Sequence, residues 1–166
     1  MRYTLTGAGA VVALVLIVVA VGYALPVKHR GEAEATFGAT PETVFALITN
    51  VEAFPTWRRG VKSVELIRST DGRKRFRELS GHGPIAYVIE SVESSRRLVT
   101  RIDDKSLPFG GTWSYELTPT TDGGTRLRIT EDGEIYNPVF RFVSRFFVGY
   151  DQTIKTYLAD VAKKVG

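Results

Sequence analysis

The residue types that carry acid–base or metal chemistry are sparse in this sequence. It has two histidines, His29 and His82, and no cysteine, which excludes disulfides and thiolate metal sites. His82 stands in the turn sequence Gly-His-Gly-Pro, and His29 lies beside an apolar N-terminal segment. Neither histidine has a second catalytic partner nearby in the sequence. We therefore interpret His82 as structural or solvated, and His29 as a solvated flank of the apolar segment.

Glu131 is the best single candidate for acid–base work. The period-two alternation of residues 125–133 places Leu127, Ile129 and Glu131 on one face of a strand, so a carboxylate stands on an otherwise apolar face. Such a group could shuttle a proton, with Tyr87 or Tyr115 as its partner. It could equally pair with an arginine or reach the mouth of a pocket, and that structural role is the commoner one. The sequence therefore names no confident catalytic residue.

Other signatures of catalysis and cofactor binding are absent from the sequence. It contains no Gly-x-Ser-x-Gly, no His-Glu-x-x-His and no phosphate-cradling glycine loop, and the pair Asp103-Asp104 alone is a weak metal site. We expect neither a metal nor a cofactor. The net charge of +4 is a mild excess, and no aromatic side chains interleave convincingly with the basic ones. Nucleic acid is therefore not an expected partner.

An apolar N-terminal segment is the clearest physical signal in the chain. No charged residue occurs between Arg2 and Lys28, and residues 5–25 are nearly all apolar. A helix of that length, rising about 1.5 Å per residue, spans a bilayer core of roughly 30 Å. We expect residues 1–30 to form a single-pass membrane anchor with its flanks, on a side that the flanking charges leave undefined. The alternative is a cleaved signal and a secreted protein, since residues 22–24 offer a cleavage site.

Residues 31–166 are expected to form one α+β domain. Strand-like runs occur at 31–38, 61–69, 74–80, 85–92, 97–103, 112–118 and 125–135. Thr40-Pro41-Glu42 predicts the start of a short helix. Apolar residues recur every three or four positions over residues 138–164, which predicts one long C-terminal helix. Burying one face of a seven-stranded antiparallel curved sheet against this helix would leave a cavity between them.

Four segments carry a resemblance to a known superfamily. They are residues 35–50 with the sequence ATFGATPETVFALITN, the turn VEAFPTW at 51–57, GTWSYELTP at 111–119 and TRLRITE at 125–131. Together they resemble the START, polyketide cyclase and plant-allergen superfamily (SRPBCC) over about residues 31–165. This resemblance implies the helix-grip fold, here preceded by one transmembrane helix, and a hydrophobic ligand such as a lipid, sterol, quinone or polyketide. Only some members of the superfamily are enzymes.

Alternation along the strands and the helical stripe assign the side chains that should line the cavity. The expected ligand-binding residues are Trp57, Tyr87, Trp113, Tyr115, Leu117, Ile129, Glu131, Phe142, Phe146 and Tyr150. Leu107 and Phe109 lie in a loop with proline and glycines, and are expected to form a mobile apolar lip over the pocket. Each aromatic residue could instead simply fill a core.

We interpret the chain as a membrane-anchored binding protein for a hydrophobic small molecule of lipid, isoprenoid or polyketide-like class. Its expected partners are that ligand and the lipid bilayer, and its oligomeric state is undefined. One alternative is a cyclase or dehydratase that uses Glu131. Another is a protein-interaction module on the same fold, which a filled cavity and an exposed apolar patch would favour.

Overall fold

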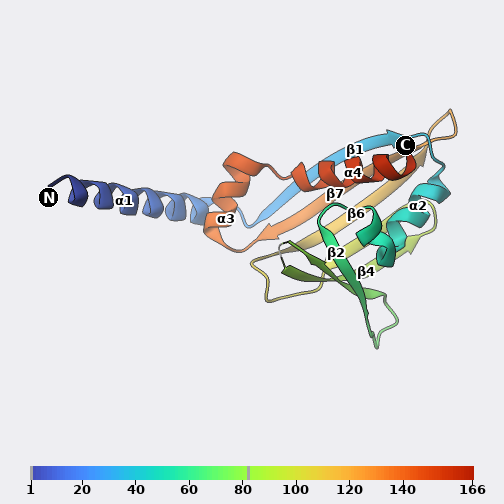
Figure 1. The fold of residues 1–166 in the computed structure, drawn as a ribbon, viewed down its shortest axis with the longest axis horizontal. Coiled ribbons are helices and arrows are strands. Elements are labelled where there is room, and N and C mark those ends of the chain that lie inside the picture. Colours follow the sequence, from blue (N-terminus) through green and yellow to red (C-terminus); the bar gives the residue numbers. More distant parts are fainter. Residues whose placement is uncertain (1, 82) are drawn as a thin grey trace.

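A seven-stranded antiparallel sheet organises the chain (Figure 1). The computed structural model describes residues 2–81 and 83–166, with side chains from residue 9 onward. The strand order is β1-β7-β6-β5-β4-β3-β2, so β2 to β7 form a meander and β1 pairs with β7. The strands are β1 (Lys28–Phe37), β2 (Val61–Ile67), β3 (Arg75–Ser80), β4 (Gly83–Glu93), β5 (Arg97–Ile102), β6 (Phe109–Pro119) and β7 (Thr125–Ile135). All seven predicted strands are present.

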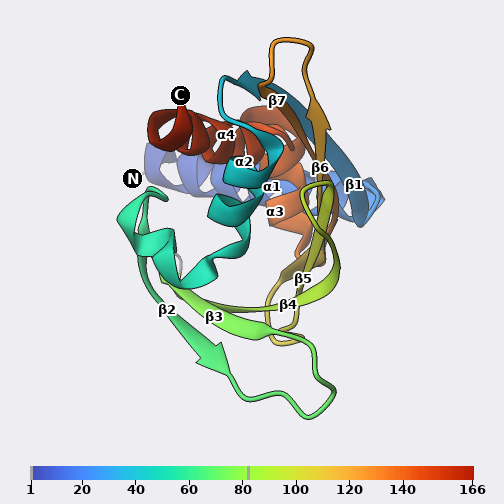
Figure 2. The same cartoon turned by 90° about the vertical axis from the view of Figure 1, so that its right-hand side faces the viewer.

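The sheet is strongly curved, and its concave face holds the helices (Figure 2). The register shifts between Val61 and Ser63 against β3, and between Ile89 and Ser91 against β5. Such irregularities bend a strand and increase its twist. The edge carrying β2 and β3 therefore swings round toward the helices, as the helix-grip prediction required.

Two short helical segments, α2 (Pro41–Thr49) and η1 (Val51–Thr56), close one end of the concave face. The Thr40 side chain accepts a hydrogen bond from the Thr43 amide (3.4 Å), and Pro41 occupies the first turn, so α2 begins where its sequence predicts. Val44, Phe45 and Ile48 of α2 are buried in the core.

The C-terminal helix α4 (Gln152–Val165) packs into the concave face. It buries Ile154, Tyr157, Leu158 and Val161 at helical spacing, as the apolar stripe predicted. Its buried Asp160 accepts hydrogen bonds from the Arg59 backbone amide (2.8 Å) and guanidinium (2.9 and 3.2 Å). These bonds tie α4 to the loop that follows η1.

The predicted continuous helix over residues 138–164 is wrong, because the chain breaks into three pieces. A short α3 (Pro138–Val143) runs into the π-helical turn η2 (Ser144–Val148), and α4 starts only at Gln152. Gly149 lies between them with φ 81° and ψ 171°, a conformation essentially restricted to glycine. The three- and four-residue spacing of apolar side chains continues across Gly149 in the sequence, so the change of direction leaves no periodic signal.

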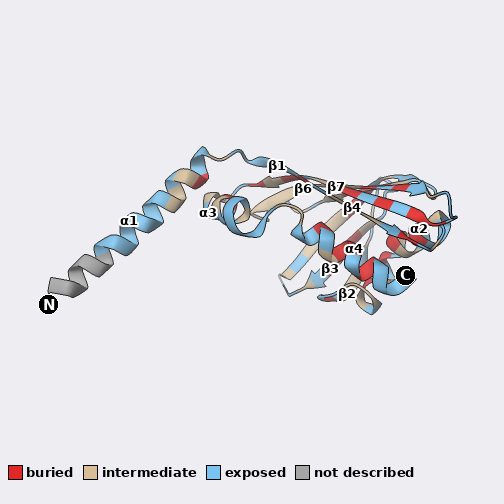
Figure 3. Cartoon of the chain, turned by 90° about the horizontal axis from the view of Figure 1, so that it is seen from above, coloured by how far each residue is buried: buried red, intermediate tan, exposed pale blue. Residues whose placement is uncertain are grey.

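The N-terminal helix α1 (Arg2–Ala24) extends away from the sheet, and its base packs against α3 (Figure 3). A Cβ at Gly22 would lie 2.0 Å from the Pro138 carbonyl oxygen, so only glycine permits this approach. Arg141 donates a hydrogen bond to the Leu25 carbonyl (2.7 Å). Within the part of the chain that the structure describes, no helix is both long and apolar enough to cross a bilayer, so the predicted transmembrane segment is not supported.

The break at Gly149 gives a stability prediction. Gly149→Ala forces a side chain into a strained backbone region and should lower the free energy of unfolding by about 1–3 kcal/mol. Gly38→Ala is the control, because a Cβ there meets open space and its φ is not in the positive region. Urea denaturation of both variants tests this, and equal stability of the two would contradict the role given to Gly149.

Candidate functional site

A cavity of about 400 Å³ lies between the concave face of the sheet and the helices. Strands β3 to β7 form one wall, and α2, η1 and the α3–η2 segment form the others. Most of the lining is apolar, with side chains that include Phe54, Phe76, Leu98, Ile102, Phe109 and Trp113. One helix of 14 residues does not fill a seven-stranded concave face, which is why the space remains open. Small-molecule sites are typically apolar cavities of this size with a few polar groups.

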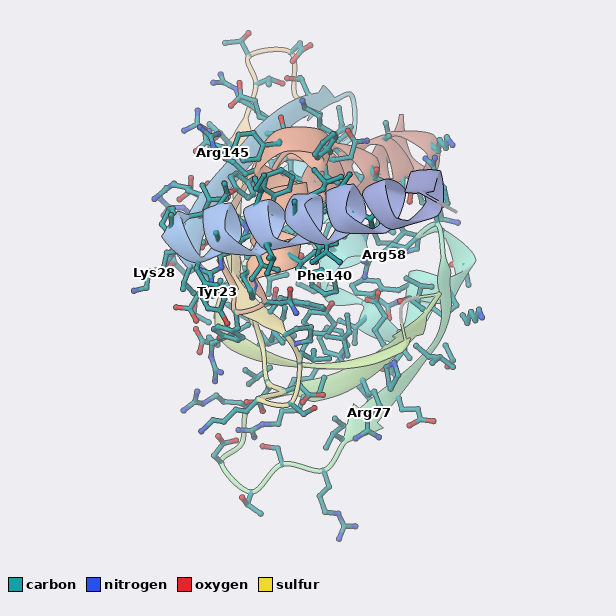
Figure 4. All side chains as sticks on the ribbon, turned by 90° about the vertical axis from the view of Figure 1, so that its left-hand side faces the viewer. Tyr23, Lys28, Arg58, Arg77, Phe140 and Arg145 are labelled. Carbon is teal, nitrogen blue, oxygen red and sulfur yellow. The ribbon has the colours of Figure 1, made fainter. Side chains whose placement is uncertain are left out.

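One end of the cavity holds a buried ion pair between Arg58, which follows η1, and Glu78 of β3. Glu78 is only 6% exposed, and Arg58 donates a short hydrogen bond to its carboxylate. The Arg58 guanidinium also lies over the rings of Phe54 (4.7 Å) and Tyr157 (5.0 Å). In Figure 4, Arg58 lies on the helix side of the sheet, whereas Arg77 points outward. The pair therefore brings two compensating charges into an otherwise apolar space.

Three tyrosines surround this ion pair. The Tyr157 ring lies 5.6 Å from that of Tyr115, and Tyr87 stacks on Phe76 at 5.2 Å. Burial raises the pKa of Tyr115 to about 12 and those of Tyr87 and Tyr157 well above the ordinary value, with the Glu78 carboxylate adding to each rise. Burial opposes the charged form of Arg58, but the Glu78 carboxylate and the tyrosines hold its pKa above the ordinary value. At neutral pH this end therefore offers protonated tyrosine hydroxyls as hydrogen-bond donors. They lie beside a charged guanidinium whose charge is balanced by the Glu78 carboxylate.

The other end of the cavity holds His29 of β1 and Glu131 of β7. The His29 Nε2 atom lies 3.8 Å from the Glu131 Oε1 atom, and the imidazole stacks on Tyr150 with ring centroids 4.3 Å apart. The interpretation of His29 as a solvated flank is wrong, because its side chain is only 10% exposed. The reason is that β1 begins at Lys28 rather than at residue 31: the amide of Ile135 bonds to the Val27 carbonyl (2.9 Å), so the pairing with β7 extends past His29.

The structure brings together half of the residues expected at the site. The cavity is lined by Tyr87, Trp113, Tyr115, Glu131, Tyr150 and Phe109. Phe109 does so from within β6, so the predicted mobile loop at this position is in fact the start of a strand.

The remaining expected residues do not line the cavity. Leu117 and Ile129 belong to the closed core, and Trp57 packs edge-on against Phe54 and Tyr157. Phe146 is exposed, because η2 turns it outward, and Phe142 packs against Phe146 and Phe147. Leu107 is half-buried in the loop before β6. His82 lies outside the described residues.

Arg58 was not predicted as a partner of Glu78. Arg58 follows a short helical turn in the sequence Trp-Arg-Arg-Gly, where no periodicity tells which arginine turns inward. The alternation of β3 does place Phe76 and Glu78 on one face, and both are buried. Among the residues that the structure describes, no group of three or more histidine or carboxylate side chains could hold a metal ion.

The buried ion pair gives a second prediction. Arg58→Met would leave the Glu78 carboxylate buried and unpaired, and should cost about 3–5 kcal/mol of stability. The double variant Arg58→Met/Glu78→Leu should lose less than Arg58→Met alone, since no unpaired charge remains. Arg77→Met is the control, because its pair with Glu65 is exposed and contributes about 0–1 kcal/mol. Urea denaturation measures these three variants and Glu78→Leu alone, and a loss in the double variant equal to the sum of the Arg58→Met and Glu78→Leu losses would contradict the coupling.

Solved structures of other proteins share this fold. The structure is similar to that of a START superfamily protein from Mycobacterium smegmatis, with a TM-score of 0.66, 17% identity and coverage of 82% of this chain and 97% of that chain. It is also similar to an aromatase/cyclase from Streptomyces sp. R1128, with a TM-score of 0.66, 11% identity and coverage of 83% and 93%. Norcoclaurine synthase from Thalictrum flavum gives a TM-score of 0.66 at 10% identity, with coverage of 84% and 94%.

Identities this low show the fold alone, and no curated protein matches the sequence significantly. A family model described as "Polyketide cyclase / dehydrase and lipid transport" matches residues 28–165, from the first residue of β1 to the last of α4. The superfamily resemblance seen in the sequence is thereby confirmed, and the chain belongs to the polyketide cyclase/dehydrase and lipid transport family.

Proposed function

We propose that this protein binds an apolar small molecule of the lipid, isoprenoid or polyketide-like class in the cavity between the sheet and the helices. The observation that carries the proposal is the cavity of about 400 Å³, apolar along most of its lining and polar at its ends. The description of the family, which names both polyketide chemistry and lipid transport, supports the same class of ligand. A protein-interaction role would call for a filled cavity, which is not what the geometry offers.

The polar end at Arg58 and Glu78 indicates what the ligand carries. Tyr87 and Tyr115 line this end of the cavity. Burial keeps both phenols protonated at neutral pH, so they can donate a hydrogen bond to a ligand oxygen. Such a bond contributes about 0.5–1.5 kcal/mol. We therefore expect a ligand with a carbonyl or hydroxyl group at this end.

The same proposal places the protein at a lipid bilayer. Support comes from exposed apolar side chains on α1, such as Leu14 and Leu16, and from η2, where Phe146 is 56% and Phe147 is 76% exposed. Both segments lie at the same end of the molecule (Figures 1 and 3). Exposed apolar surface of this extent marks a contact with a membrane or another protein. The α3–η2 segment also lines the cavity through Phe140, Val143 and Val148, so a ligand could pass between bilayer and cavity there.

Ligand binding is tested by native mass spectrometry of the full chain released from lipid nanodiscs, in which a bound molecule adds its mass to the protein and is identified by fragmentation of the complex. We expect a co-purifying apolar molecule in the parent protein. Thr100→Phe puts a ring into the polar end of the cavity and should reduce binding about tenfold or more, equivalent to about 1.4 kcal/mol. Thr118→Phe makes the same change at an exposed position of β6 and should leave binding unchanged. A parent protein that yields no apolar molecule, and takes up no lipid or quinone added to the nanodiscs, would reject the proposal.

Membrane contact is tested with tryptophan as a depth probe. Phe147→Trp should show blue-shifted emission with vesicles, and quenching by brominated phosphatidylcholine, because its ring would lie among acyl chains. Leu66→Trp, at an exposed position of β2 away from η2, should show neither effect above the background of Trp57 and Trp113. Equal quenching of the two variants would contradict contact through η2.

A further inference from the structure

The pair of His29 and Glu131 forms a second polar site, distinct from the Arg58 end of the cavity. His29 and Glu131 stand on β1 and β7, at one edge of the sheet, whereas Glu78 stands on β3, beside the other edge. Four strand spacings separate β7 from β3, or about 19 Å measured along the sheet. The two pairs therefore stand on different strands and face different parts of the cavity.

The space for this pair is kept open by two glycines. A Cβ at Gly133 would lie 2.3 Å from the His29 Nε2 atom, so the imidazole occupies the volume that any other residue would fill. A Cβ at Gly31 would lie 2.2 Å from the Tyr150 carbonyl oxygen, so Gly31 likewise permits the approach of Tyr150. Tyr150 then stacks on the imidazole and restricts its orientation. The position of His29 is therefore fixed by three surrounding elements, which are β1, β7 and the segment before α4.

The hydrogen-bonding groups of the pair are incompletely used. At 3.8 Å, the contact between His29 and Glu131 is an ion-pair distance rather than a hydrogen bond. The Nδ1 atom of His29 is buried without a partner among the described residues. The neighbouring carboxylates face other groups: Glu134 accepts a hydrogen bond from the Tyr136 hydroxyl (2.8 Å), and Asp132 pairs with Arg30 (3.5 Å). Glu131 is thus the carboxylate of β7 that faces both His29 and the cavity.

We propose that His29 and Glu131 are an acid–base pair that transfers protons to and from a ketone bound in the cavity. This inference rests on the proposed binding function, and it gives Glu131 a histidine as its partner in place of Tyr87 or Tyr115. The ligand class is an apolar molecule with a carbonyl group whose neighbouring carbon carries a hydrogen. Histidine and carboxylate side chains placed within reach of the transferred proton are the usual means of such catalysis.

The proton balance is closed by the two side chains. The Glu131 carboxylate takes the proton from the carbon next to the carbonyl, and the electron pair of that C–H bond becomes the new C=C bond. The carbonyl π pair moves to oxygen, which takes a proton from the protonated imidazole of His29. The products are an enol, neutral His29 and protonated Glu131. Reversal after exchange with solvent returns the ketone and both side chains to their starting states, so no other reactant is needed.

The test follows hydrogen–deuterium exchange at the carbon next to the carbonyl of two apolar ketones, 1-tetralone and 1-indanone. The full chain in nanodiscs is incubated with each ketone in D₂O, and exchange is measured by NMR. We expect at least tenfold faster exchange than in empty nanodiscs. Glu131→Gln should lower the catalysed rate about 100-fold or to background, and His29→Gln should lower it as well. Asp132→Asn alters a carboxylate of the same strand that pairs with Arg30 outside the cavity, and should retain the parent rate.

Ketone binding is measured separately by saturation-transfer NMR in the same samples, with retained binding expected in all variants. Bound ketone without accelerated exchange in the parent protein would overturn the acid–base inference and leave the binding proposal intact. Exchange that persists at the parent rate in Glu131→Gln would overturn the assignment to this pair. Failure of both ketones to bind the parent protein would count against the binding proposal and this inference together.

Discussion

The structure depends on one constraint: a curved sheet with an apolar concave face must bury that face. Among the described residues, the 14-residue helix α4 is the one helix that packs along this face. Helix α4 covers the part of the sheet nearest β1, β6 and β7, where Ile154, Leu158 and Val161 are buried. The rest of the concave face is capped at one end by α2 and η1, and at the other by α3 and η2. The uncovered middle becomes the cavity. The cavity therefore exists because the helices cover only part of the concave face, and no single residue creates it.

The two polar ends of the cavity differ in what they contribute. At the Arg58 end the charges are compensated and the tyrosines stay protonated, so this end can orient a ligand oxygen through neutral donors. At the His29 end the two groups lie at ion-pair distance and the imidazole keeps an unmade hydrogen bond. The arrangement at the Arg58 end suits the binding of a ligand without catalysis. The second arrangement is better suited to proton transfer, because an imidazole and a carboxylate lie side by side there and both line the cavity.

The sequence predicted the sheet well because period-two alternation and turn residues are local signals. Strand β7 was predicted with its observed bounds, and the inner face of β6 with Trp113 and Tyr115 was correctly identified. Most of the cavity residues that were predicted correctly lie on such strands, and Tyr150, from the C-terminal apolar stripe, is the exception. Arg58 escaped because it lies in an aperiodic turn, and His29 because the pairing that extends β1 to Lys28 depends on β7, more than 90 residues away. Phe146 was misplaced because a helical stripe does not reveal where the helix stops.

The interruption at Gly149 decides how the cavity is closed. A helix that continued from Pro138 to the C-terminus would run straight, and Phe142 and Phe146 would then lie on the same side as Ile154. Instead, Gly149 redirects the chain, Phe146 and Phe147 face outward, and Val148 and Tyr150 line the cavity from the two sides of the glycine. The residue after this break, Tyr150, stacks on His29. One glycine with φ 81° thus links the outward apolar surface of η2 with the placement of the acid–base pair inside.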